Sequence, residues 1–153
     1  MPHPRKLLFV LTDGGRARFV RHVSDVNDFA TLEEIDQMAQ LKKLRAELRA
    51  SPSGRAFESA SASRHEVGRN KQVRESKEAF MAEVAERALA TVERLGLEAI
   101  FIAAPARLVG VLRGRLESRA TVAGALGKDL TKTPDHELHA WLDSALLRTQ
   151  TSG

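Results

Sequence analysis

The apolar run Ala99–Ala104, AIFIAA, constrains the fold of this chain more than any other stretch. A short continuous run without polar residues is typical of a strand that is covered on both faces. An apolar stripe at helical spacing over Phe80–Leu95 precedes it, and leucines four residues apart follow it. A buried strand between two helices indicates a crossover in a layered α/β architecture.

The remaining patterns extend this strand into a mixed sheet flanked by helices. Lys6–Thr12 and Ala17–Val23 are expected to be strands of an antiparallel hairpin, and Thr121–Leu126 is a further strand candidate. Thr31–Ala50 has apolar residues three and four apart, which predicts an amphipathic helix, with a short edge strand over Leu32–Met38 as the alternative. The length of 153 residues fits one domain over 1–153.

Helix-capping residues set the expected ends of the helices. Gly96 follows the apolar stripe as a C-terminal cap, and Thr133 and Pro134 are expected to start the last helix. Its core-facing side chains are predicted to be Leu138, Trp141, Leu142, Ala145 and Leu146. Residues 148–153 are expected to form a frayed C-terminal tail.

Ser51–Gln72, SPSGRAFESASASRHEVGRNKQ, has small polar residues and hardly any apolar anchor. Such a segment contributes little to a core, so it is expected to be an exposed, flexible, basic loop. Loops of this length inside a compact domain are either functional or disordered.

Composition restricts the classes of function. The chain has no cysteine, which excludes disulfides, thiolate metal sites and a cysteine nucleophile. The run Leu7–Leu11 is too short for a signal-peptide core, and no stretch reaches the length of a membrane span, so a cytoplasmic protein is expected. A net charge of +4 favours anionic partners, and the scarcity of aromatic residues means that any RNA would be held mainly through its phosphates.

The turn after the first strand, Asp13-Gly14-Gly15, allows three interpretations. Asp13 resembles the first carboxylate of a two-metal nuclease, but the strand ending IAAP brings no acid to join it. A Walker-type phosphate loop requires a following lysine and helix, whereas a strand follows here. A hairpin turn that uses glycine at positive φ is the favoured interpretation.

No catalytic constellation emerges from the remaining polar residues. His136 and His139 are expected on the surface of the last helix, and no Ser/His/Asp arrangement can be argued. No metal site and no cofactor are predicted. The strongest signal for binding is the concentration of cations in and after the loop, which suits contacts with phosphate groups. The predicted RNA-binding residues are Gly54, Arg55, Arg64, His65, Arg69, Lys71, Arg74 and Lys77, with Asp13, Arg16 and Arg18 as secondary candidates.

Several stretches together resemble the bacterial host attachment protein family, described as required for attachment to host cells. They are FVLTDGGRARFV, SGRAF, KEAFMAEVAERAL, LEAIFIAAPARLVGVLRGRL and KDLTKTPDHELHAWL, and they cover nearly the whole chain. That family is similar to the middle domain of eukaryotic and archaeal peptide-chain release factors and of Pelota. The resemblance implies a ribonuclease H-like fold without nuclease activity and a partner in ribosomal RNA or tRNA on the ribosome.

The release-factor GGQ sequence is missing from Ser51–Gln72, so peptidyl-tRNA hydrolysis is not expected. The leading hypothesis is a non-enzymatic, RNA- or ribosome-associated protein that binds through its basic segment. The alternatives are a protein-interaction or regulatory factor in attachment and, on Asp13 alone, a Mg²⁺-dependent nuclease or hydrolase.

Overall fold

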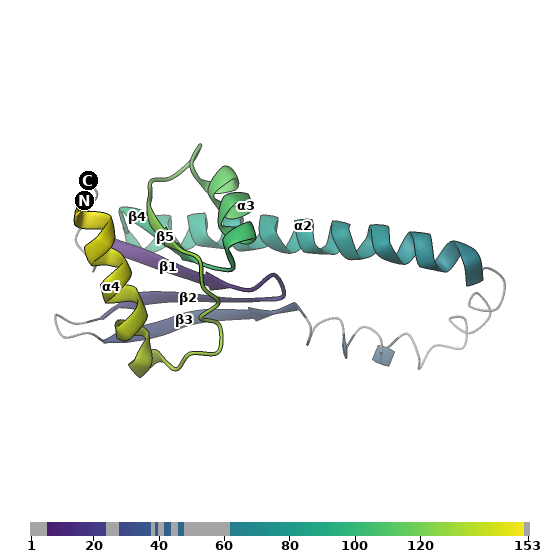
Figure 1. The fold of residues 1–153 in the computed structure, drawn as a ribbon, viewed down its shortest axis with the longest axis horizontal. Coiled ribbons are helices and arrows are strands. Elements are labelled where there is room, and N and C mark those ends of the chain that lie inside the picture. Colours follow the sequence, from purple (N-terminus) through teal and green to yellow (C-terminus); the bar gives the residue numbers. More distant parts are fainter. Residues whose placement is uncertain are drawn as a thin grey trace.

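Five strands form one twisted sheet with helices on both faces (Figure 1). The computed structural model describes residues 6–23, 28–37, 39, 42–43, 46–47 and 62–151, of which 62–76 and 147–151 are described by their backbone alone. In this part of the chain the elements are β1 (Leu7–Thr12), β2 (Arg16–His22), β3 (Phe29–Asp36), α2 (Ala62–Leu95), β4 (Ala99–Ala103), α3 (Ala106–Leu116), β5 (Val122–Leu126), a 3₁₀ turn (Asp135–Glu137) and α4 (Leu138–Thr151).

The strand order is β3-β2-β1-β4-β5, which makes the sheet mixed. β1 and β2 form the predicted antiparallel hairpin, and β3 continues it on the outer side of β2. β4 lies parallel to β1, with Phe9 opposite Phe101, and β5 lies parallel to β4. The α/β single-domain prediction and both parallel pairings are therefore confirmed.

Alternation along the central strands builds a separate core on each face of the sheet. Leu8 and Val10 of β1 point to the face covered by α2 and α3, whereas Leu7, Phe9 and Leu11 point to the face covered by α4. Every residue of β1 and β4 is buried, as expected for strands with a helix on each side. On the α4 face, the Phe9 ring packs edge-on against Phe29 at a centroid distance of 5.2 Å.

Thr31–Asp36 is a strand, so the predicted helix over Thr31–Ala50 is wrong in this part. The alternative, a short edge strand beginning near Leu32, matches the structure better. Leu32 and Ile35 lie three residues apart and fit either period, but β2 offers a free edge that satisfies the backbone of this segment. From residue 37 onward the described residues are helical, and the rest of 38–50 lies outside the described residues.

Helix α2 begins at Ala62 and is therefore longer than the apolar stripe over Phe80–Leu95 predicts. The second half of the expected loop, residues 62–72, is therefore helical, whereas residues 51–61 lie outside the described residues. Arginine, lysine, glutamine and glutamate are good helix formers, so this segment continues the helix without an apolar face. Its C-terminus closes as predicted: Gly96 has φ +64°, and the Leu97 amide donates to the Val92 carbonyl at 2.9 Å.

In helix α4 the predicted core positions Leu138, Leu142, Ala145 and Leu146 are buried. The prediction for Trp141 is wrong, because this residue is 41% exposed. The indole lies beside α4 rather than beneath it, and the Lys128 ammonium sits 3.6 Å from the ring centroid. This cation–π contact satisfies a side chain that the helical spacing alone places close to the core. The helix also runs to Thr151, so residues 148–151 are helical where a frayed tail was expected.

Candidate functional site

Arg18 stands at the centre of the main polar network in the described part of the chain. It lies on β2, where Ala17 and Phe19 point to the α2 face and Arg18 points with Val20 to the α4 face. Because α4 and the segment before it cover this face, the Arg18 side chain is only 8% exposed. A guanidinium at such a depth is expected to be paired and fully hydrogen-bonded.

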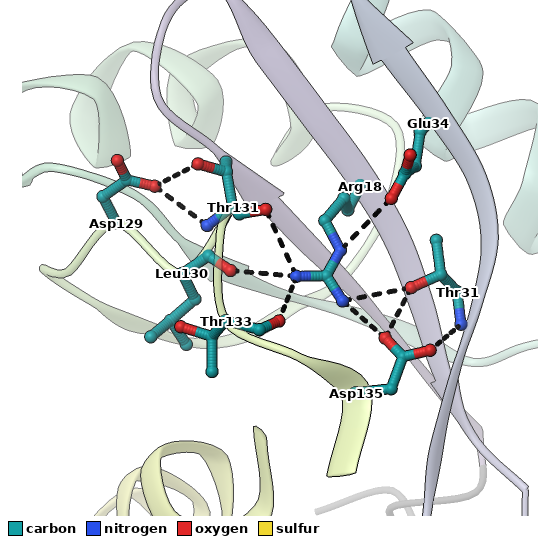
Figure 2. A network of polar contacts seen from close by, with 8 residues as sticks. All are labelled: Arg18, Thr31, Glu34, Asp129, Leu130, Thr131, Thr133 and Asp135. Atoms are coloured by element: carbon teal, nitrogen blue, oxygen red, sulfur yellow. Dashed lines mark hydrogen bonds and ion pairs between the residues drawn. The ribbon is translucent and has the colours of Figure 1, made fainter. Parts of the chain in front are cut away.

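The segment between β5 and α4 wraps around this guanidinium (Figure 2). Nη1 donates to the backbone carbonyls of Leu130, Thr131 and Thr133 at 3.1, 3.3 and 2.5 Å. Nη2 donates to the Asp135 carboxylate at 2.5 Å and to the Thr31 hydroxyl at 3.1 Å. We call Arg18, Thr31, Asp135 and the three carbonyls the Arg18 cluster.

Asp135 is held in its charged form by the same contacts. Partial burial would raise the pKa of Asp135, but the hydrogen bonds from the Thr31 hydroxyl and amide, together with Arg18, outweigh it and hold the pKa below its ordinary value. The cluster thus ties β2, β3 and the start of α4 together. The Arg18 guanidinium is thus engaged within the fold, and its place as a secondary candidate for RNA contact stays a prediction.

Asp13 serves the hairpin turn, as favoured from the sequence. Its Oδ1 accepts hydrogen bonds from the amides of Gly15 and Arg16 at 2.9 and 2.8 Å, and Gly14, directly after Asp13, has φ +99°. The Asp13 side chain therefore stabilises the turn by accepting hydrogen bonds from backbone amides within it. Arg16, the next predicted residue, is exposed and forms an ion pair with Asp36 of β3 at 3.5 Å.

Asp13 and Asp129 both approach the hydroxyl of Thr131. The hydroxyl lies 2.6 Å from Asp129 Oδ1 and 3.5 Å from Asp13 Oδ2, so its single proton goes mainly to Asp129. Within the described ranges, no group of three or more histidine, cysteine, aspartate or glutamate side chains is arranged to hold a metal ion. The geometry gives Asp13 a structural task in the turn.

The predicted basic site divides between two parts of the chain. Gly54 and Arg55 lie outside the described residues. Arg64, His65, Arg69, Lys71 and Arg74 all belong to the first half of α2, and the exposed Lys77 follows them on the same helix. The first buried side chain described on α2 is that of Phe80, and Figure 1 shows the helix running well past the end of the sheet before that contact begins.

This projecting segment, residues 62–77 of α2, therefore carries five of the cations predicted to bind RNA. They are accompanied by two carboxylates, Glu66 and Glu75, and by no aromatic residue. At a rise of about 1.5 Å per residue the segment is a rod about 24 Å long. The segment contains only three apolar residues, one alanine and two valines, so its composition offers no apolar stripe and suits polar or charged partners.

In the packed half of α2, Arg87 is paired with carboxylates. It is bonded to Glu33 of β3 and forms an ion pair with Glu83 at 3.2 Å. Arg87 and Glu33 line a shallow groove between β3 and α2, together with Ala90, Thr91 and the exposed Arg94. The ion pair between Arg87 and Glu33 joins α2 to the edge strand of the sheet.

The Arg18 cluster and the Lys128–Trp141 contact were both missed from the sequence. The available signal for the cluster is the alternation in RARFVRH, which places Arg18 on the same face as Val20 of a strand with neighbours on both sides. A polar residue at such a position must be bonded internally, and the stretch KDLTKTPD supplies the acceptors.

Comparison with known proteins gives a family match. Residues 8–142 match the family described as "Protein required for attachment to host cells", a match that extends from β1 into α4. The chain has no match among curated proteins. In the described ranges no helix is both long and apolar enough to cross a lipid bilayer.

Proposed function

The chain belongs to the family of proteins required for attachment to host cells, and we propose that it acts as an RNA-binding, ribosome-associated member of it. The observation that carries this proposal is the projecting segment of α2. Its five cations stand on the part of α2 that extends past the sheet in Figure 1. Ribosomal RNA or tRNA is the proposed partner.

The chemistry of the segment favours a polyanion over a protein groove. A helix that docks into an apolar groove needs anchors at spacings of three, four and seven, and residues 62–77 contain only Ala62, Val67 and Val73 as apolar residues. Clustered arginine and lysine residues instead gain binding energy by releasing counterions from phosphates. Because the segment has no aromatic side chain, it offers no platform for stacked bases.

The position of the segment supports a further part of the proposal. We infer that Ser51–Gln72, whose second half begins α2, corresponds to the loop that release-factor middle domains place just before their long helix and that reaches into the ribosome. We accordingly propose a ribonuclease H-like relationship for the mixed sheet and a cytoplasmic site of action. No catalytic role is proposed, since Asp13 is engaged in the hairpin turn.

Ribosome co-sedimentation and fluorescence anisotropy with tRNA test this function. The wild-type chain is expected to bind, with affinity falling about 100-fold or more between 50 and 200 mM salt if about five phosphates are contacted. The double variant Arg64→Gln, Arg69→Gln is expected to reduce the slope of log K against log salt by about 1.5 to 2. Glutamine preserves helix propensity and removes only the charge.

A charge-matched control is available on α3. Arg113→Gln with Arg115→Gln removes the same number of positive charges from a helix packed beside the sheet, where Arg113 is bonded to Glu117 within one turn. This control is expected to bind like the wild type. Absence of binding by the wild type, or equal losses in the two double variants, contradicts the proposal and favours a protein-interaction or regulatory role in attachment.

A further inference from the structure

We draw no further inference here: the strongest candidate, the outward face of α3 where Gly110, Val111 and Gly114 lie exposed between Arg107 and Arg115, carries none because nothing in the part of the chain that the structure describes shows what covers it.

Discussion

Replacing Arg18 by methionine measures how much of the stability depends on the Arg18 cluster. Methionine approximates the aliphatic stem of the arginine side chain but lacks the guanidinium and donates no hydrogen bond. The substitution leaves the carbonyls of Leu130 and Thr131 without this donor and Asp135 without its counter-ion. Removing one partner of a buried ion pair costs about 3 to 5 kcal/mol.

The expected cost for this site lies at the lower end of that range. The side chain of Arg18 is 8% exposed, but that of Asp135 is 41% exposed, so water re-solvates part of the carboxylate after the substitution. We expect Arg18→Met to lower the free energy of unfolding by about 3 kcal/mol. For a domain of this size such a loss lowers the melting temperature by about 6 to 12 °C.

Urea denaturation followed by two signals provides the assay. Circular dichroism reports the whole fold, and the fluorescence of Trp141, the single tryptophan of the chain, reports α4. If the cluster fastens the start of α4, the fluorescence transition of the variant is expected at a lower urea concentration than the circular dichroism transition. Coincident but shifted transitions would indicate that the whole domain loses stability together.

Arg16→Met is the matched control because it makes the same change two residues earlier on the same strand. The Arg16 side chain is 46% exposed, and its ion pair with Asp36 spans 3.5 Å, so its loss is expected to cost at most about 0.5 kcal/mol. The reasoning is refuted if Arg18→Met costs no more than Arg16→Met.

Three further predictions concern pH and glycine. The pKa of Asp135 is lowered in the fold, so the stability that Asp135 contributes is full above the ordinary aspartate pKa and is lost as the pH falls through the folded value. Measuring the free energy of unfolding against pH in the wild type and in Asp135→Asn checks this. Burial raises the pKa of Asp143 despite the opposing charges of His22 and His139, so Asp143→Asn is expected to be more stable than the wild type at neutral pH. This advantage is expected to disappear as the pH falls through the pKa of Asp143 in the folded state. Gly96→Ala, at φ +64°, is expected to lower the free energy of unfolding by about 1 kcal/mol in urea denaturation. Gly114→Ala, in open space inside α3, is expected to raise it by about 0.5 to 1 kcal/mol. Equal effects of the two substitutions would contradict the explanation of the Gly96 effect by backbone conformation.

The elements that the sequence predicts well are those with one dominant local signal. The run AIFIAA has no polar residue to place at a surface, so burial on both faces is its only stable arrangement. Gly96 likewise ends α2 because the chain needs a residue with positive φ there, and the space where a Cβ would stand is open, so the backbone conformation alone favours glycine.

The elements predicted poorly are those in which the spacing of apolar residues fits more than one structure. The spacing from Leu32 to Ile35 fits a helix as well as a strand, and the outer edge of β2 decides the outcome. Trp141 follows the helical spacing of the core, but a large amphipathic ring is equally well placed beside α4 under the Lys128 ammonium. Both outcomes depend on neighbours that are distant in the sequence.

The same dependence on residues distant in the sequence explains why the sequence alone did not distinguish Arg18 from the exposed cations. Arg16 and Arg18 lie two residues apart in RARFV and share one face of β2, but only Arg18 is buried under the segment before α4, whereas the Arg16 side chain at the start of the strand is 46% exposed. The polar residues of KDLTKTPD then close around Arg18, so this stretch is specified by an internal requirement of the fold. The cations of the projecting segment of α2 are the better candidates for a partner, because this part of the helix extends past the sheet. Neutralising Arg18 should therefore change stability, whereas neutralising Arg64 and Arg69 should change binding alone.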